Sequence, residues 1–312
     1  MTNTLRIGTR GSDLALWQAR RVSEIIGQRL GLGCELVIVQ TQGDRIQNVA
    51  FHKMEGKGFF TKELQLALLD QRVDLVVHSL KDLPTEEPDG LAVAAIPERT
   101  TPADLLLARK GSLSPTDADP LGLPHRARLG TSSLRRAAQV LALRPDLELS
   151  ALRGNVPTRI RKLRENRYDA IVVAAAGVGR LELDLTDLDT WGLAPEVMLP
   201  APGQGALAIE TRAQDSARAR LAELHDPAAA RCVGAERNLL QLLGGGCHLP
   251  LGCLATDEDD GAVRLQAVLG EVDENITRSR VARVGAVAPT PEEAARACYE
   301  ALRLAMPEVA TA

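Results

Sequence analysis

The feature that most constrains the fold is an alternation of short apolar runs with helical patterns, which occurs twice along the 312 residues. In the first block, apolar runs at residues 5–8, 35–39 and 74–77 are separated by helical periodicity at 13–30 and 61–69. Strands that alternate with helices are typical of a parallel sheet with crossover helices. The first block therefore predicts an α/β lobe.

The second block repeats the pattern. Strands are predicted at residues 127–130, 147–152 and 170–174, with helices at 133–143 and 156–165 between them. Two similar α/β lobes predict a cleft in which a ligand binds. The intervening segment is rich in Pro, Ser, Asp and Gly, and we expect it to be the linker between the blocks; it covers residues 110–125.

The remainder of the chain predicts a smaller α+β domain. A strand-like run at 206–210 follows a Pro-Ala-Pro-Gly sequence, and helical patterns follow it at 215–224 and 227–242. Residues 261–287 alternate as antiparallel strands do, and a helix is predicted at about 291–305.

Charge and cysteine usage exclude several classes of protein. The net charge of −4 gives no reason to expect a nucleic acid or an anionic membrane as partner. The five cysteines are widely spaced without a CxxC pair, which favours a reducing compartment over a disulfide framework. The N-terminus lacks the apolar core of a signal peptide, and the longest apolar run, 170–179, is too short to span a bilayer. We therefore expect a soluble cytoplasmic protein.

Arginines gather where predicted strands end and helices begin. The sequence GTSSLRR places hydroxyls and two arginines at a helix start, where free N–H groups and the helix dipole favour an anion. Arginine adds forked recognition of carboxylate or phosphate. Capping hydroxyls followed by solvated arginines would explain one such site, but the pattern recurs at other strand ends. The arginines concerned are Arg10, Arg135, Arg136, Arg153, Arg159 and Arg180.

The sequence defines the chemical class of the anion less closely than it defines the arginine pattern. Neither GxxxxGK[ST] nor GxGxxG follows a strand, so carboxylates fit at least as well as phosphates. The stretch DLVVHSLKDLP ends a buried strand in a turn that carries Lys81 and Asp82. A carboxylate among cations stays ionised, and it can stabilise a developing cation or exchange a proton with a nitrogen. A surface Lys–Asp turn is the plainer alternative.

The stretch LLGGGCHLPLGC presents a cysteine after three glycines. Cys247, His248 and Cys253 match no standard zinc spacing, so no metal site is predicted. A Cys–His nucleophile requires facing side chains, which adjacent residues seldom provide. Three glycines also argue against a buried structural thiol. What remains is a thiol offered to something large, with the glycine-punctuated stretch KMEGKGFF at 53–60 as a loop over the site.

Eight motifs occur together in order: LRIGTRGSDLALWQA, GKGFFTKEL, HSLKDLP, GTSSLRR, LRGNV, YDAIVVAAAG, LPAPGQGALAIE and LGGGCHLPLG. In this combination the chain resembles the porphobilinogen deaminase family over residues 5–255. The resemblance implies condensation of four porphobilinogen molecules head to tail, with loss of ammonia, into hydroxymethylbilane. It further implies a dipyrromethane cofactor, built from two porphobilinogen units and attached by a thioether to Cys247.

The resemblance also assigns roles to individual residues. Asp82 is implied as the catalytic carboxylate that bonds the pyrrole N–H and stabilises the azafulvenium cation. The implied cofactor-binding residues are Cys247, Lys81, Asp82, Thr131, Ser133, Arg135, Arg136, Arg153 and Gly154. The implied substrate-binding residues are Arg10, Ser12, Ser79, Arg153, Arg159, Arg180 and Gln204, the last in the interdomain hinge. The implied active-site loop carries Lys53, Lys57 and Phe60.

The fold implied by the resemblance has three domains, of which two resemble the lobes of periplasmic binding proteins. Domain 1 would comprise residues 1–103 and 201–220, domain 2 residues 104–200, and domain 3 the α+β residues 221–312 with the cofactor cysteine. The family implies a monomer. The chain departs from the usual family pattern at Glu55, Phe59, Gly244 and His248, which affects loop behaviour and removes no expected catalytic group.

Two other functions are compatible with parts of the sequence. A bilobed binding protein for an organic anion would explain the lobes and the arginines, but not a cysteine on a glycine loop. A cysteine-dependent acyl-transfer enzyme would use Cys247 and His248, although no third group or oxyanion element is evident.

Overall fold

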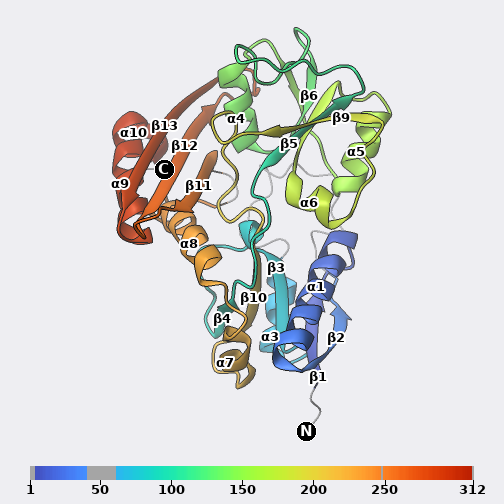
Figure 1. The fold of residues 1–312 in the computed structure, drawn as a ribbon, viewed down its shortest axis with the longest axis vertical. Coiled ribbons are helices and arrows are strands. Elements are labelled where there is room, and N and C mark those ends of the chain that lie inside the picture. Colours follow the sequence, from blue (N-terminus) through green and yellow to red (C-terminus); the bar gives the residue numbers. More distant parts are fainter. Residues whose placement is uncertain (1–3, 41–60, 247–248, 311–312) are drawn as a thin grey trace. The chain divides into compact units, whose positions relative to one another are not determined.

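The computed structural model describes residues 4–40, 61–246 and 249–310 (Figure 1). Their contacts divide the chain into two compact units. The first unit comprises Met1–Thr100 and Gly205–Val233, and the second comprises Thr101–Gln204 and Gly234–Ala312.

The first unit is built on a five-stranded sheet of order β2-β1-β3-β10-β4. The first three strands are parallel, as predicted: β2 (Gly33–Ile38), β1 (Thr4–Thr9) and β3 (Leu75–Ser79). β10 (Leu207–Arg212) lies antiparallel between β3 and β4 (Leu91–Ala95), so the sheet is mixed. Because β10 follows all five strands of the second sheet in the sequence, the chain returns to the first unit after residue 204.

The helices of this unit cover the sheet because their apolar side chains recur on one face. In α1 (Asp13–Leu30), Val22, Ile25 and Ile26 are buried and belong to the same cluster as Ile7 of the sheet. Full burial of such a side chain stabilises a fold by roughly 1.5–3 kcal/mol. α3 (Lys62–Leu69) and α7 (Ala217–Ala222) also lie in this unit, and α8 (Pro227–Leu242) begins in it.

The second unit contains a five-stranded sheet of order β7-β6-β8-β5-β9. The predicted strands form its parallel part: β6 (Arg128–Gly130), β7 (Glu148–Ser150) and β8 (Ala170–Ala174). β5 (Asp104–Arg109) pairs antiparallel with β8 on one side and with β9 (Leu188–Leu193) on the other, and neither strand was predicted from the sequence. The helices are α4 (Leu134–Leu143), α5 (Val156–Arg164) and α6 (Ala175–Arg180).

The segment 110–125 is not a linker between the two blocks, contrary to our expectation. It lies inside the second unit, between β5 and β6, because β5 pairs with β8 and β9. Its composition marks a loop correctly, but composition does not show which sheet the preceding strand joins.

The predicted C-terminal α+β region is confirmed as an antiparallel three-stranded sheet within the second unit. β11 (Leu251–Asp257) pairs with β12 (Val263–Val272), which pairs with β13 (Ser279–Ala288). α8 (Pro227–Leu242) precedes the sheet, and α9 (Pro291–Ala305) and α10 (Pro307–Ala310) follow it. Thr290 caps α9 by accepting the N–H of Glu293, with Pro291 at the first helical position.

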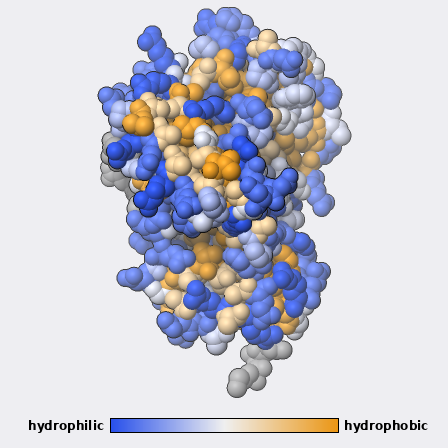
Figure 2. Space-filling view, turned by 60° about the vertical axis from the view of Figure 1, so that its left-hand side comes forward, coloured by the Kyte–Doolittle hydropathy of each residue, from blue (hydrophilic) through white to orange (hydrophobic). Residues whose placement is uncertain are grey.

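Within the described residues, no helix has the length and apolarity needed to cross a bilayer. The face shown in Figure 2 presents polar and charged residues interleaved with smaller apolar areas.

Candidate functional site

The first unit brings two groups of predicted site residues to one edge of its sheet. β1 and β3 are parallel neighbours, so the residues that follow them meet at the carboxyl edge. Arg10 and Ser12 follow β1, and Ser12 is the N-cap of α1 without a side-chain capping bond. Ser79 ends β3, and its hydroxyl accepts a hydrogen bond of 2.7 Å from Gln18 Nε2 of α1. This bond fixes the strand end to the helix that Ser12 begins.

Asp82 ends a single 3-10 turn, η2 (Leu80–Asp82), directly after β3. Leu80 is buried and anchors the turn, whereas Asp82 is exposed. Lys81, the preceding residue, is half-buried. Within the residues that the structure describes, the Asp82 carboxylate has no hydrogen bond or ion pair. An exposed carboxylate at a strand end can act on a ligand.

A buried polar cluster lies behind this strand end and was missed in the sequence. His78 Nε2 of β3 lies 2.9 Å from Glu210 Oε2 of β10, and Glu210 Oε1 accepts a hydrogen bond from Gln65 Nε2. Both His78 and Glu210 are almost fully buried. The cluster ties β3, β10 and α3 together immediately before the turn that carries Asp82.

Lys53, Lys57 and Phe60, predicted for the active-site loop, lie outside the described residues. The same holds for Glu55 and Phe59, where the chain departs from the family pattern.

The second unit gathers a larger set at the carboxyl edge of β6, β7 and β8. Thr131 and Ser133 follow β6, and Ser133 caps α4 by accepting the N–H of Arg136. Thr131 donates its N–H to Ser150 at the end of β7, and the Ser132 hydroxyl bonds the Leu152 carbonyl. These bonds place the two strand ends side by side.

Arg153, Gly154 and Arg159 share the second strand end of this edge. Arg153 and Arg159 are half-buried, and Arg159 Nε donates to the Gly154 carbonyl at 2.7 Å. Asn155 caps α5 by accepting the N–H of Thr158. Gly154 has a φ of +107°, and a Cβ there would lie 2.7 Å from Thr158 Cγ2. Only glycine therefore fits this turn.

Replacing Gly154 with alanine is expected to lower the free energy of unfolding of the second unit by about 2–4 kcal/mol, because backbone strain and a steric clash add. Gly111→Ala is the matched control: its φ is +77°, but no atom lies within 4 Å of the added Cβ. Thermal unfolding should show a clearly larger loss for Gly154→Ala. Equal losses would show that Thr158 moves aside at no cost.

Arg135 and Arg136 are held inside the second unit by Asp104 of β5. Arg135 Nη1 lies 2.8 Å from Asp104 Oδ2, and Arg136 Nη2 lies 2.8 Å from Oδ1. Arg135 also donates to the Leu199 carbonyl, and Arg136 to the Val172 carbonyl. The three side chains are buried, with Asp104 wholly inaccessible. Both arginines therefore have an internal partner, Asp104, that was not predicted from the sequence.

Electrostatics explain why a carboxylate is tolerated there. Burial alone would raise the pKa of Asp104, but the charges and hydrogen bonds of Arg135 and Arg136 lower it well below its usual value. Burial lowers the pKa of Arg135, although the charge of Asp104 opposes the shift. Two guanidinium groups and one carboxylate leave the cluster with excess positive charge at the start of α4.

Gln204 and Arg180 are also buried in the second unit. Gln204 Nε2 donates to Asp104 Oδ1 at 2.7 Å and to the Pro102 carbonyl at 2.6 Å. Gln204 is thereby joined to the Asp104 cluster. Arg180 ends α6, which directly follows β8, and only 6% of it is exposed.

The glycines before the cysteine end α8 in a defined way. Gly244 has a φ of +64° and donates its N–H to the Gln241 carbonyl, while Gly245 donates to Leu240. This pair of bonds is the Schellman motif, which places a left-handed residue just after a helix. A Cβ on Gly245 would lie 2.7 Å from Leu249 Cδ2. At least two of the three glycines therefore meet local geometric demands. Cys247 and His248 themselves lie outside the described residues.

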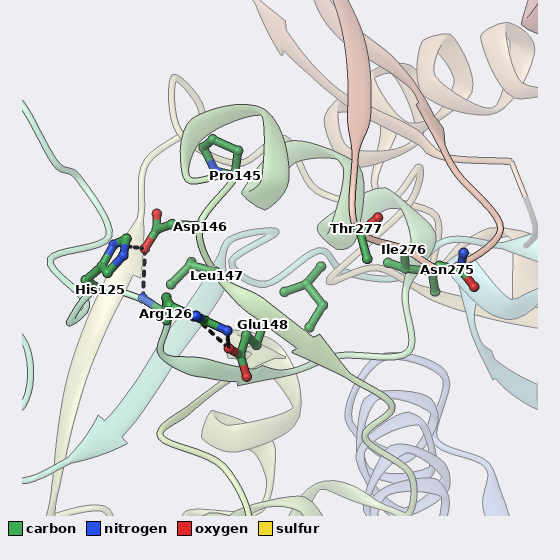
Figure 3. A pocket seen from close by; sticks show the side chains of 10 residues that line it. His125, Arg126, Pro145, Asp146, Leu147, Glu148, Asn275, Ile276 and Thr277 are labelled. Carbon is green, nitrogen blue, oxygen red and sulfur yellow. Dashed lines mark hydrogen bonds and ion pairs between the residues drawn. The ribbon is translucent and has the colours of Figure 1, made fainter.

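One hollow of the surface lies away from these residues. A cavity of about 460 Å³ is lined by His125, Arg126, Asp146 and Glu148 on one side and by residues 275–277 of the β12–β13 turn on the other (Figure 3). Its charged groups are paired, His125 with Asp146 at 3.1 Å and Arg126 with Glu148 at 2.7 Å. None of the predicted site residues lines it. Among the described residues, no cluster of His, Cys, Asp and Glu suits a metal ion.

The fold and the strand ends together define a two-lobed α/β protein with an antiparallel C-terminal domain, whose strand ends carry cationic and hydroxyl groups. Two family models match it. "Porphobilinogen deaminase, dipyromethane cofactor binding domain" matches residues 5–220, and "Porphobilinogen deaminase, C-terminal domain" matches residues 230–305. The chain belongs to the porphobilinogen deaminase family.

Curated relatives agree over most of the chain. The porphobilinogen deaminase of Nitratidesulfovibrio vulgaris is 48% identical over 286 residues, which cover 89% of this chain and 85% of that protein. The enzyme of Moorella thermoacetica is 46% identical over 271 residues, which cover 86% and 84% respectively. The chain has porphobilinogen deaminase activity in tetrapyrrole biosynthesis, with a dipyrromethane cofactor, as the resemblance implied.

Solved structures are similar at a lower level. An ancestral cationic amino acid solute binding protein is 13% identical with a TM-score of 0.45, covering 71% of this chain and 88% of that one. The periplasmic VFT2 domain of BvgS from Bordetella pertussis is 11% identical with a TM-score of 0.43, covering 72% and 86%.

Proposed function

We propose that the chain condenses four porphobilinogen molecules head to tail into hydroxymethylbilane, with dipyrromethane attached through Cys247 and Asp82 as the catalytic carboxylate. The observation that carries the proposal is the exposed Asp82 carboxylate, which ends a turn directly after β3 on the sheet edge shared with Arg10 and Ser12. The three-glycine end of α8 leads into Cys247 by a defined turn.

The donor set of the chain fits the cofactor. Each pyrrole unit carries an acetate and a propionate, so a dipyrromethane and the growing chain present several carboxylates. Guanidinium groups and helix N-termini are the donors that match carboxylates. When bound, the cofactor supplies the primer to which the first substrate is joined. The residues proposed to hold it are Cys247, Lys81, Asp82, Thr131, Ser133, Arg135, Arg136, Arg153 and Gly154.

Not every guanidinium in this set is equally available. Arg153 and Arg159 are half-buried, so both are partly accessible at the strand end. Arg135 and Arg136 are buried and share Asp104, so their contribution is the excess positive charge of the cluster. The residues proposed to bind substrate carboxylates and amine are Arg10, Ser12, Ser79, Arg153, Arg159, Arg180 and Gln204.

Asp82 has the chemistry that each condensation requires. The C–N bond of the substrate aminomethyl group breaks, and nitrogen leaves with the electron pair as ammonia after gaining a proton. The pyrrole nitrogen supplies electrons and becomes positively charged, and its N–H donates to the Asp82 carboxylate. An ionised carboxylate lowers the energy of that cation. The new C–C bond then forms, and the attacking α-carbon loses its proton.

The remaining assignments are proposals of the same kind. We propose the domain division 1–103 with 201–220, 104–200, and 221–312, which the return of β10 to the first sheet supports. The two compact units differ from this division, because residues 205–233 belong with the first sheet and the C-terminal sheet belongs with the second. We further propose that the enzyme works as a cytoplasmic monomer, with Lys53, Lys57 and Phe60 on its active-site loop.

Intact-mass measurement tests the attachment site. The purified enzyme is expected to carry the added mass of two pyrrole units, and Cys247→Ser should carry none and have no activity. Cys34→Ser is the control, because Cys34 is a half-buried cysteine of β2 in the first unit and should leave the adduct in place. Active enzyme without an adduct would contradict the proposal, and so would an adduct that survives in Cys247→Ser.

A further inference from the structure

Glu236 is a fully buried carboxylate on α8. Its Oε2 accepts the N–H of Gly203 at 2.7 Å, and its Oε1 accepts the N–H of Ala255 at 2.9 Å. Each oxygen thus bonds a different part of the backbone. Burying a carboxylate is costly unless N–H groups compensate it, so an arrangement of this kind fixes the geometry of all three segments.

Two of the three segments, α8 and β11, flank the loop that carries Cys247 in the sequence, and the third contains Gly203. α8 leads into the loop through the Schellman turn at Gly244. β11 leaves it, with Ala255 in the middle of the strand. Gly203 belongs to the segment 199–204, at whose end the chain passes back to the first unit. One carboxylate therefore joins both stems of the loop to the crossing segment.

Neighbouring contacts keep these segments close. The Cys253 N–H donates to the Pro200 carbonyl at 2.9 Å. A Cβ on Gly252 would lie 2.7 Å from the Leu199 carbonyl oxygen, so the backbones pack too tightly for a larger residue. The Cys253 thiol also faces the Glu236 carbonyl, at 3.9 Å. The stems are held by backbone packing, and Glu236 is the side chain that spans them.

We propose that Glu236 is a positioning residue that holds the two stems of the cysteine loop in register with segment 199–204, so that Cys247 is presented for attachment of the cofactor. The inference rests on the proposed role of Cys247. Glu236 touches no reacting atom in this scheme and acts through the backbone of the loop stems.

Glu236→Gln provides a sharp test because it preserves shape. A glutamine has one amide oxygen, so it can accept only one of the two N–H groups, and its NH₂ faces the other as donor against donor. Glu236→Asp keeps the charge but is shorter, so it should retain one bond. Leu302→Ala is the matched control: Leu302 is fully buried on α9, and its truncation destabilises the C-terminal region without touching Glu236.

The measurement is the rate at which cofactor-free enzyme gains the mass of two pyrrole units from porphobilinogen, taken well below the melting temperature of every variant. Glu236→Gln should load about tenfold more slowly than wild type, which corresponds to roughly 1.4 kcal/mol, with Glu236→Asp between the two. Once loaded, Glu236→Gln should keep kcat within about twofold, since the catalytic carboxylate is unchanged. Leu302→Ala should load at the wild-type rate despite its lower melting temperature.

Two results would overturn the inference alone: wild-type loading by Glu236→Gln, or equally slow loading by Leu302→Ala, which would make the effect one of stability. If wild-type protein gains no mass at Cys247, the proposed attachment site fails and the inference fails with it. Should Glu236→Gln not fold, the loading rate of Glu236→Asp decides on the same terms.

Discussion

Asp82→Asn is expected to fold as wild type does and to lose at least a hundredfold in turnover. The side chain is exposed and has no hydrogen bond or ion pair within the described residues, so its replacement should change stability by less than about 0.5 kcal/mol. Its shape is preserved and only the charge is lost. A positioned acid–base group contributes typically about 10²–10⁴-fold to a rate, and electrostatic stabilisation of the pyrrole cation is of similar size.

The control for this prediction is Asp89→Asn. Asp89 is an exposed carboxylate on the same segment between β3 and β4, and the proposal gives it no role. Activity should be unchanged in Asp89→Asn and lost in Asp82→Asn, at equal melting temperatures and with substrate binding largely retained. Turnover of Asp82→Asn within about threefold of wild type would remove Asp82 from the reaction, because even one general acid–base contribution exceeds that factor.

Much of the fold could be predicted because its parallel strands are apolar runs between helices. β1, β3, β6 and β8 are read directly from this pattern, and so is α1. β5 and β9 were missed for different reasons. β5 begins with a charged residue, Asp104, and precedes a long loop, whereas exposed residues interrupt β9. Pairing partners lie far apart in the sequence, so neither strand's place in the sheet follows from local pattern.

The candidate site shows the same limit at the level of single residues. Strand ends are visible in the sequence, and the structure places Thr131, Ser133 and Gly154 there together. The partner of Arg135 and Arg136 was not visible, because Asp104 is about thirty residues away on another strand. The burial of Glu236 could have been predicted from the sequence, because it occupies the apolar face of α8, three residues from both Val233 and Leu239. A charge at such a position indicates a buried partner.

Asp104→Asn is expected to lower the free energy of unfolding of the second unit by about 3–5 kcal/mol. Asn keeps the shape but removes the charge that offsets two buried guanidinium groups, and it can accept hydrogen bonds with only one oxygen. Asp169→Asn is the control, because Asp169 directly precedes β8 of the same sheet. Its partners Arg128 and Arg109 are about half exposed, so the loss there should be below about 1 kcal/mol.

Unfolding of the second unit can be measured separately because the chain has only two tryptophans, one in each unit. Trp17 lies in α1 of the first unit and Trp191 in β9 of the second. In a Trp17→Phe background, fluorescence reports on β9, which pairs with β5, the strand that Asp104 begins. An equal loss for Asp169→Asn and Asp104→Asn would show that the buried cluster is no more important than an exposed ion pair.

The pH dependence of the same pair gives an independent check of the cause. The arginines lower the pKa of Asp104 in the folded protein below its value of about 3.9 in the unfolded chain. Its contribution to stability is therefore complete above about pH 5 and is lost as pH falls below about 4. The difference in stability between wild type and Asp104→Asn should shrink by about 1 kcal/mol between pH 5 and pH 3. In this range Asp104 is protonated in the unfolded wild-type chain, and folding must release that proton. A difference that stays constant down to pH 3 would show that Asp104 acts through shape and hydrogen bonding rather than through its charge.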